Sequence, residues 1–597
     1  MKNRIPCPVW ARIALAVALV AGVAPSALSV EIRGLVRTSD GQPVAGAMVT
    51  VDSSSAAAAT TTVFSGADGN YRVPDLGPGV GYNSLSIGCR KIGFVQSAPE
   101  PRYVTDLIRQ SLAVAREYGV EITCVLRPEA NVAGQASASA WLSSAIPDAE
   151  PGRARFIWTC SNCHQAASDN MRIVAAALSR NSESEREAAW RAIGTGMAAR
   201  FANATSVQHG APPGVAADPY ALFMNKEDVD NAARILAKYM ATDFDRLPLS
   251  SVPKAESLQS EKTVIQEFDF RVSDAFVREV AVTPSSPYTW GVDINHNRLL
   301  RLNPATGETR WLDIPGTGAF APHTMTPARD GTIWLTLLEP NDGVAEVQFD
   351  PKKETFRAYG GFPKGIATHD FAGSPGYFAE FDNQGYGWLS NPAGNSLVGF
   401  NPQTGDVVNY PLPLPPGETS NLHVLLYGAA MTAGKNVWFT QLGGYIGEFD
   451  TVKRKVTTLI NLPVGNAPRR LAVGDDEILY VPLHGDGSIY VYDAKNHKHL
   501  GTYSLPDRNA APYAVTWDPV RKKVWVANAN SNSLYQFDPV TKSFRELPLP
   551  RRNSYVRMIA IDQQTADLWL TYAPIPQTHS LITRIGLGDL ARSESRQ

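Results

Sequence analysis

Short runs in which apolar and polar residues alternate fill the second half of the chain, and they predict strands rather than helices. An aromatic residue near the end of a hydrophobic strand recurs seven times, at Trp290, Trp334, Trp388, Trp438, Tyr480, Trp525 and Trp569. A second strand follows each, and the repeat of about 42 to 54 residues suits a four-stranded blade. The pattern predicts a seven-bladed β-propeller over residues 263–592, with a linear β-solenoid as the alternative.

The seventh repeat has little chain left for an outer strand. Residues Thr263 to Phe268, which precede the first repeat, alternate as a strand should. We expect them to supply the missing strand, so that the ring closes without a free edge.

Alternating strands also open the chain, at Ile32–Val36, Ala47–Val51 and around Ala67–Val73, with turns between them. The pattern G-x-V-x-x-x-x-G-x-P-V-x-G-A-x-V-T-V followed by A-D-G-x-Y resembles the carboxypeptidase regulatory-like domain, a transthyretin-like β-sandwich. The resemblance implies a noncatalytic spacer or docking module over residues 30–130, with a binding site as the alternative. A helical insert is expected at Tyr103–Tyr118.

Cys160-Ser161-Asn162-Cys163-His164 matches Cys-x-x-Cys-His, the attachment motif of a c-type haem. Two thiols one helical turn apart can form thioethers, and the adjacent imidazole can bind the iron. The motif predicts one covalent haem c on Cys160 and Cys163 with His164 as proximal ligand. A thioredoxin-like redox pair and half of a zinc site are the alternatives.

Gly152, Phe156 and Cys160, spaced by four, resemble the first helix of class I cytochromes c. The resemblance implies an all-α cytochrome c domain over residues 152–245, between linkers at 131–151 and 246–262. A closing helix is predicted after Asn225, a good N-cap. Met197 follows a predicted helix at 184–193 and a Gly-Thr-Gly loop, and this arrangement resembles the G-x-G-M segment of the family. The resemblance favours Met197 as the sixth ligand of the haem iron. The other candidates for this ligand are Met171, Met224, Met240 and His209.

The first 29 residues read as an export signal, because basic residues precede an apolar run and small residues follow it. That run is shorter than a bilayer span requires, so an uncleaved anchor is the weaker alternative and no transmembrane anchor should remain after cleavage. Cys89 and Cys124 are then expected to form a disulfide in an oxidising periplasm, or to be buried free thiols. The net charge of -2 excludes a broad nucleic-acid surface.

Segments such as Asn436-Val437-Trp438-Phe439-Thr440-Gln441 with Gly444-Tyr445-Ile446-Gly447 resemble streptogramin (virginiamycin B) lyase propellers. The resemblance implies catalysis by His, with Glu at the end of the W-F-T-E strand binding magnesium. His323 alone matches the histidine context. The Glu positions carry residues with no carboxylate: Leu337, Asn391, Gln441, Asn528 and Tyr572.

Counting back from the aromatic of each repeat places further residues at the channel mouth: Arg278, His323, Tyr427, Arg470, Tyr513 and Arg557. The three arginines with Tyr513 predict an anion-binding or substrate funnel, and a solvated rim is the alternative. The chain is therefore expected to be a multidomain, mainly β, periplasmic haem c electron-transfer protein. Its partner would be a dehydrogenase, a small cytochrome or an anionic small molecule. A lyase with an accessory cytochrome and a noncatalytic scaffold or sensor are the alternatives.

Overall fold

A computed structural model gives the fold, and its described residues run from 32 to 589. Gaps in this range fall at 54–55, 75, 77–84, 98–119, 209–224, 242–244, 273, 316–321, 338–343, 364–365, 367–368, 375–377, 393, 415–423, 464 and 576–578. The predicted signal segment and the helical insert expected at 103–118 lie outside the described residues.

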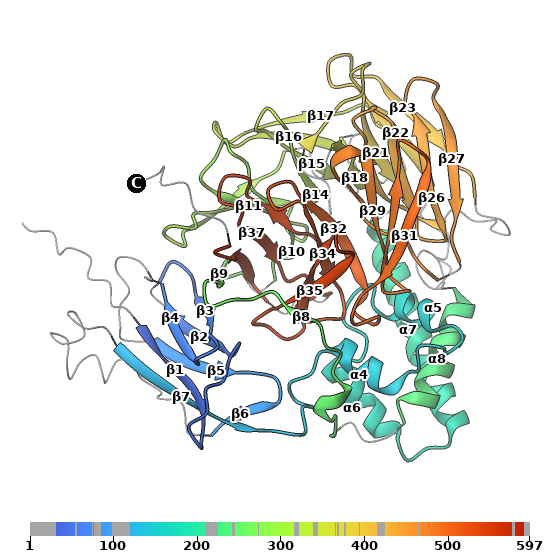
Figure 1. Cartoon of the computed structure of the whole chain (residues 1–597). Helices are drawn as coiled ribbons and strands as arrows, with labels where there is room; N and C mark the ends of the chain where they lie inside the picture. The colour runs from blue at the N-terminus through green and yellow to red at the C-terminus, as the bar shows by residue number, and fades with distance from the viewer. Residues whose placement is uncertain are drawn as a thin grey trace, which may run out of the picture.

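Seven blades of four antiparallel strands form the second half of the chain (Figure 1). The first four blades are β10 (Val277–Ala281), β11 (Thr289–Asp293), β12 (Arg298–Leu302) and β13 (Thr309–Asp313); β14 (Pro322–Pro327), β15 (Ile333–Leu337), β16 (Glu346–Asp350) and β17 (Thr355–Tyr359); β18 (His369–Phe371), β21 (Gly387–Asn391), β22 (Ser396–Phe400) and β23 (Val407–Pro411); and β24 (Leu426–Met431), β25 (Val437–Gln441), β26 (Tyr445–Asp450) and β27 (Lys455–Asn461). The short strands β19 (Gly373–Ser374) and β20 (Phe378–Ala379) extend the fourth blade beside β24.

The remaining blades are β28 (Ala472–Val473), β29 (Ile478–Leu483), β30 (Ser488–Asp493) and β31 (Lys498–Ser504); β32 (Pro512–Asp518), β33 (Lys523–Asn528), β34 (Ser533–Asp538) and β35 (Ser543–Pro548); and β36 (Ala560–Ile561), β37 (Leu568–Thr571), β38 (Leu581–Gly586) and β9 (Val264–Asp269). Innermost strands of successive blades contact one another from β10 through β14, β18, β24 and β28 to β32. The ring closes where β10 contacts β37, and where Thr516 of β32 donates to the main-chain oxygen of Ile559 beside β36.

Strand β9 completes the seventh blade by pairing with β38, as the alternation at residues 263–268 predicts. Its other edge pairs with β3 (Thr60–Phe64) of the N-terminal domain, so that Thr62 lies opposite Ile265. The outer edge of this blade is therefore covered by a neighbouring domain. One continuous sheet, in the order β36-β37-β38-β9-β3-β2-β5, joins the two domains.

Two sheets form the N-terminal domain, drawn in blue in Figure 1. One contains β4 (Asn70–Val73), β1 (Ile32–Thr38), β7 (Val120–Pro128) and β6 (Phe94–Gln96), and the other contains β3, β2 (Met48–Ser53) and β5 (Leu85–Arg90). Apolar side chains from both sheets are buried together between them. A disulfide between Cys89 on β5 and Cys124 on β7 links the two sheets.

Five α-helices appear in the described residues and lie together beside the propeller (Figure 1). They are α4 (Ala138–Ala145), α5 (Arg153–Cys160), α6 (Asp169–Leu178), α7 (Glu183–Gln208) and α8 (Lys226–Tyr239). The closing helix α8 begins as predicted, because Asn225 accepts from the Asp228 N–H at 2.8 Å in a capping box. None of the described helices has the length and hydropathy needed to cross a bilayer.

Both segments that the sequence assigns to linkers carry regular structure instead. In residues 131–151, Ser137 caps α4, and the buried Trp141 and Leu142 fix this helix against the rest of the molecule. In residues 246–262, the short turn η2 (Leu249–Ser251) is followed by β8 (Glu256–Ser257), which pairs with β35 of the propeller. Small residues in these segments allow close packing rather than flexibility.

A single hydrophobic core runs from the helices into the propeller. Phe156, Ile157 and Trp158 of α5 belong to the same buried cluster as Tyr513 and Tyr555 of the propeller. Because separating the two parts would expose this surface to water, the helical segment and the propeller form one packed unit.

Candidate functional site

Helix α5 ends at the first cysteine of the Cys-x-x-Cys-His segment, and the residue before the helix lies against α8. Gly152 precedes α5 with φ of 81°, and a Cβ on it would lie 2.1 Å from Oδ1 of Asn231 in α8. Both the backbone conformation and the close approach therefore require glycine. Arg155 forms an ion pair with Asp228 of α8, while Phe156 is buried on the other side. These contacts fix the direction in which the cysteine segment leaves the helix.

The two thiols of the motif are free and half-buried. Burial raises the pKa of Cys160 to about 12, with a smaller contribution from Asp228. Burial likewise raises the pKa of Cys163, against the opposing effect of two nearby arginines. A thioredoxin-like redox pair needs a thiol whose pKa is lowered, because the thiolate is the nucleophile. The environment of these cysteines disfavours that alternative.

His164 follows the second cysteine and is also half-buried. Its Nδ1 lies 2.9 Å from the main-chain oxygen of Gln165, which can accept the Nδ1 proton and leave Nε2 available for a metal. Within the described parts of the chain, no three His, Cys, Asp or Glu side chains gather as a zinc ion would need. Two free thiols one turn apart and an adjacent imidazole fit a covalently attached haem.

Side chains of the propeller hold the two residues between the cysteines. The Oγ atom of Ser161 lies 2.9 Å from Nε2 of His484, which is fully buried. Burial and the repulsion of Arg469 hold the pKa of His484 well below its usual range, so the ring is neutral. Arg469 donates to Oδ1 of Asn162. We call residues 160–164 the cysteine loop.

Main-chain atoms of the cysteine loop are bound by the propeller as well. The hydroxyl of Tyr555 donates to the carbonyl oxygen of Ser161 at 2.7 Å and also to that of Asn162. The N–H of Ile575 donates to the carbonyl oxygen of Cys163 at 2.7 Å. Tyr555 and Ile575 both belong to the seventh repeat, so the cysteine loop is seated on the end of the channel at which innermost strands begin.

The residues that the sequence places at the channel mouth do come together, around the hydroxyl of Tyr513. Arg557 donates to this hydroxyl from Nη1 at 2.9 Å, and Nη2 of Arg278 lies 3.4 Å from it. The hydroxyl of Tyr427 is hydrogen-bonded to the same oxygen. All four side chains are buried, so they form part of the interior rather than a solvated rim.

Glu279 joins this group as its acidic member. Arg278 pairs with the Glu279 carboxylate, and Nη1 of Arg470 lies 2.5 Å from it. His323, the candidate base, contributes its main-chain oxygen, which accepts from Arg278 at 3.1 Å. We call Arg278, Arg469, Arg470 and Arg557 the arginine cluster.

The arginine cluster changes the acidity of the tyrosines within it. Burial acts to raise the pKa of Tyr513, but the four guanidiniums, Arg557 foremost, outweigh it and lower this pKa to about 7. Tyr427 and Tyr555, which lie against the same group, have pKa values raised by burial. Tyr513 is therefore the tyrosine that ionises near neutral pH.

Counting from the repeat aromatics misses four members of the site, namely Arg469, Glu279, Tyr555 and His484. The count selects one residue per repeat, whereas Arg469 and Glu279 are chain neighbours of selected residues. Tyr555 precedes its repeat's selected residue by two positions. The consecutive arginines at 469 and 470 were the signal that could have identified Arg469 as a member of the site. Two adjacent guanidiniums, if both are buried, need more than one partner.

The Gly-Thr-Gly loop predicted before Met197 is not present, because residues 194–196 lie inside α7. A Cβ on Gly194 would come 3.0 Å from Val229 of α8, so this glycine serves helix packing rather than a turn. Met197 is 48 % exposed, and its role as sixth ligand stays a prediction. Among the other candidates, Met240 is buried and the sulfur of Met171 lies 3.0 Å from the Ala167 amide nitrogen. Met224 and His209 lie outside the described residues.

The positions that would carry Glu in a streptogramin lyase have local structural roles. Gln441 donates to Oδ1 of Asn395 at 2.5 Å, and Asn391 donates to Oγ of Ser396 at 3.0 Å. Tyr572 donates to the buried Glu267 at 2.9 Å. These side chains tie loops and neighbouring strands together, and none offers a carboxylate to a hard cation.

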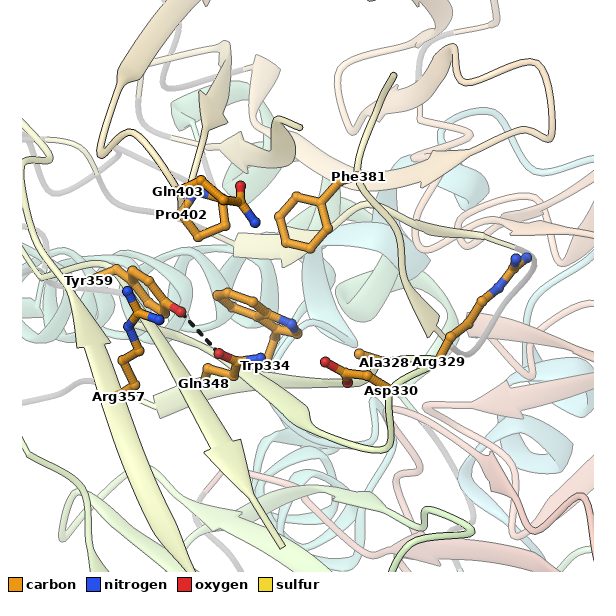
Figure 2. A pocket seen from close by; sticks show the side chains of 10 residues that line it. All are labelled: Ala328, Arg329, Asp330, Trp334, Gln348, Arg357, Tyr359, Phe381, Pro402 and Gln403. Atoms are coloured by element: carbon orange, nitrogen blue, oxygen red, sulfur yellow. Dashed lines mark hydrogen bonds between the residues drawn. The ribbon is translucent and has the colours of Figure 1, made fainter. Parts of the chain in front are cut away.

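A separate cavity of about 380 Å³ lies between the second and third blades (Figure 2). Trp334, Tyr359 and Phe381 form its aromatic wall, and the carboxylate of Asp330 lies at its edge. Trp334 already stacks on Tyr359 and on Phe371. The cavity lies away from the cysteine loop, because its lining includes the turns at 328–330 and 402–403, which are at the opposite ends of the strands.

Residues 31–105 match the carboxypeptidase regulatory-like domain model. The N-terminal β-sandwich is thus a regulatory-like domain, as the sequence pattern predicts. A search of curated proteins finds no match to the chain.

Solved structures similar to the chain include two lyases. A streptogramin B lyase is 17 % identical, with 54 % of this chain and 98 % of that chain covered and a TM-score of 0.45. Virginiamycin B lyase from Staphylococcus aureus is 16 % identical, with 54 % and 99 % covered and a TM-score of 0.45.

Proposed function

We propose that the protein is an exported, periplasmic haem c protein that transfers single electrons to or from a partner. The observation that carries this proposal is the state of the Cys-x-x-Cys-His segment, with two free thiols at the end of a helix and an imidazole whose Nε2 is available. Cys160 and Cys163 would form the thioethers, and His164 would bind the iron. When bound, the haem supplies a one-electron couple whose potential depends on its axial ligands and surroundings.

The chain's own residues have three tasks in this proposal. The crossing of α5 with α8 orients the thiols. The hydrogen bond from His164 to Gln165 fixes the imidazole tautomer. Tyr555 and Arg469 hold the loop on the propeller, so that the haem group would keep a constant position relative to a partner bound on the helical side.

Lyase chemistry at the same end of the propeller is disfavoured by two features of the described residues. The cysteine loop and α5 cover the mouth of the channel, and the arginine cluster beneath is buried. The strand ends carry Leu337, Asn391, Gln441, Asn528 and Tyr572, which cannot supply an anionic ligand set. These strand-end positions therefore offer no carboxylate with which His323 could share a metal ion.

The test is a pyridine haemochrome assay on full-length protein produced in a periplasm that attaches c-type haem. One thioether-linked haem per chain is expected, and the Cys160→Ser, Cys163→Ser double variant should carry none. The Cys89→Ser, Cys124→Ser double variant is the matched control and should retain haem. Protein that remains free of covalent haem under conditions that mature another c-type cytochrome in the same cells would refute the proposal.

A further inference from the structure

Two members of the arginine cluster, Arg469 and Arg557, are buried away from any described carboxylate. Their side chains are 1 % and 4 % exposed. Arg278 and Arg470 contact the carboxylate of Glu279. Neither Arg469 nor Arg557 forms an ion pair with an acidic side chain among the described residues. The positive charges of these two guanidiniums are therefore not cancelled by a carboxylate in the described part of the chain.

Aromatic rings lie against the two guanidiniums instead. The guanidinium carbon of Arg557 lies 4.5 Å from the ring centre of Tyr555 and 5.1 Å from that of Tyr513. The guanidinium carbon of Arg469 lies 4.5 Å from the ring centre of Tyr513. The face of an aromatic ring attracts a cation, but the ring carries no net charge. The electrostatic field of each guanidinium therefore extends beyond the rings that contact it.

Both guanidiniums lie close to the cysteine loop. Arg469 donates to Oδ1 of Asn162, which lies between the two cysteines. Arg557 lies over the ring of Tyr555, whose hydroxyl donates to the carbonyl oxygen of Asn162. Burial raises the pKa of the Cys163 thiol, and both guanidiniums oppose this rise. The segment that would carry the haem therefore lies in the positive field of the two arginines.

We propose that Arg469 and Arg557 raise the reduction potential of the haem attached at the cysteine loop. A one-electron centre carries one more positive charge when it is oxidised, so a nearby positive charge favours its reduced form. Buried charges are screened much less than charges at the surface, so the effect should persist in high salt. This inference rests on the proposed haem function and adds which residues of the propeller set the potential.

Tyr513 makes this field depend on pH. The charged and titratable groups around its side chain are Arg278, Arg469, Arg470, Arg557, Tyr427, Tyr555 and His484. Burial acts to raise the pKa of Tyr513, but the four guanidiniums lower it to about 7. An ionised Tyr513 places a negative charge beside Arg557, so the potential should fall as pH rises through about 7. The electron lost on oxidation goes to the redox partner, and the proton lost by Tyr513 goes to solvent.

Spectroelectrochemical titration of the full-length haem-loaded protein measures the potential through the haem absorption. Arg557→Gln should lower the equilibrium constant for reduction at least threefold, which is about 28 mV at 59 mV per tenfold change for one electron. Arg557→Lys keeps the charge and should retain the wild-type potential. Arg310→Gln is the matched control and should have no effect, because this side chain is exposed on β13 and pairs with Glu354.

Two further variants keep the test decisive. If Arg557→Gln fails to fold, Arg469→Gln and Arg469→Lys give the same comparison at the second charge. Tyr513→Phe removes the group that ionises, so its potential should depend on pH less than that of the wild-type protein between about pH 6 and pH 8.

Equal potentials in the wild-type protein and the folded Gln variant would overturn the proposal. A Lys variant whose potential falls as far as that of the Gln variant would overturn it too, because a lost contact rather than a lost charge would then explain the change. An unaltered pH dependence in folded Tyr513→Phe would overturn the role of Tyr513. Protein without covalent haem would refute the proposed function itself, whereas covalent haem with an unaltered potential in the Gln variants would refute this inference alone.

Discussion

The seating of the cysteine loop makes Tyr555 the most informative single position. Tyr555→Phe removes one oxygen and leaves the ring packed against Arg557, whose guanidinium lies 4.5 Å from the ring centre. The lost hydroxyl donates to the carbonyl oxygens of Ser161 and Asn162. Leaving such buried groups without a donor costs about 1 to 3 kcal/mol, which corresponds to a roughly 5- to 150-fold rise in the equilibrium constant for loop opening.

Hydrogen exchange of peptides covering residues 156–166 in the haem-free protein measures this opening. The expected result is faster exchange by that factor, with the outer strands of the propeller unchanged. Tyr503→Phe is the matched control, because its hydroxyl makes only a long contact of 3.4 Å on an outer strand. Exchange in the loop that stays within twofold of wild type, in a variant with an unchanged circular dichroism spectrum, would show that the propeller does not hold the loop.

Two further predictions concern the cysteines and the sixth ligand. Thiol counting on the unfolded, unreduced haem-free variant lacking Cys160 and Cys163 should find no free thiol, and Cys89→Ser with Cys124→Ser should destabilise the regulatory-like domain by about 3 to 4 kcal/mol, since the bridge closes a loop across 35 residues. Two free thiols would contradict the pairing. In the haem-loaded protein, Met197→Ala should abolish the weak absorption band of sulfur-to-iron ligation, whereas Met240→Ala should retain it because Met240 fills a core position. A band that survives Met197→Ala would assign the ligand elsewhere.

Features that repeat along the chain could be predicted from the sequence alone. The seven aromatics gave the number of blades because each is buried at the same place in its sheet, as with Trp290, Trp388 and Trp438. The completing strand β9 could be found because the seventh repeat was short and strand alternation preceded the first. The same count located Arg278, Arg470, Arg557 and Tyr513 at one end of the ring, since equivalent positions in equivalent strands converge on its axis.

Features that depend on unique long-range contacts could not be read in this way. The segment containing α4 is rich in Ala and Ser, as a linker would be, and only its packing with the propeller distinguishes it. Gly194 looked like a turn residue because the contact that explains it is with Val229, 35 positions away. Pairing of β9 with β3 likewise could not be predicted from either strand alone. The alternation of apolar and polar residues identifies each segment as a strand, but it does not say which strand lies beside its outer edge.

That pairing and the shared core of α5 with the propeller act together on the cysteine loop. The chain enters the ring through β9, which is held on one edge by β38 and on the other by β3. It reaches β9 only after the helical segment, which is itself packed on the end of the channel. Glu267 on β9 reinforces this arrangement, because its carboxylate accepts from Thr60 of the regulatory-like domain and from Tyr572 of the seventh blade. The packed helical segment and the paired strand β9 thus hold the chain on which the cysteine loop lies. A group attached to Cys160 and Cys163 would therefore be held at the channel mouth rather than on a mobile tether.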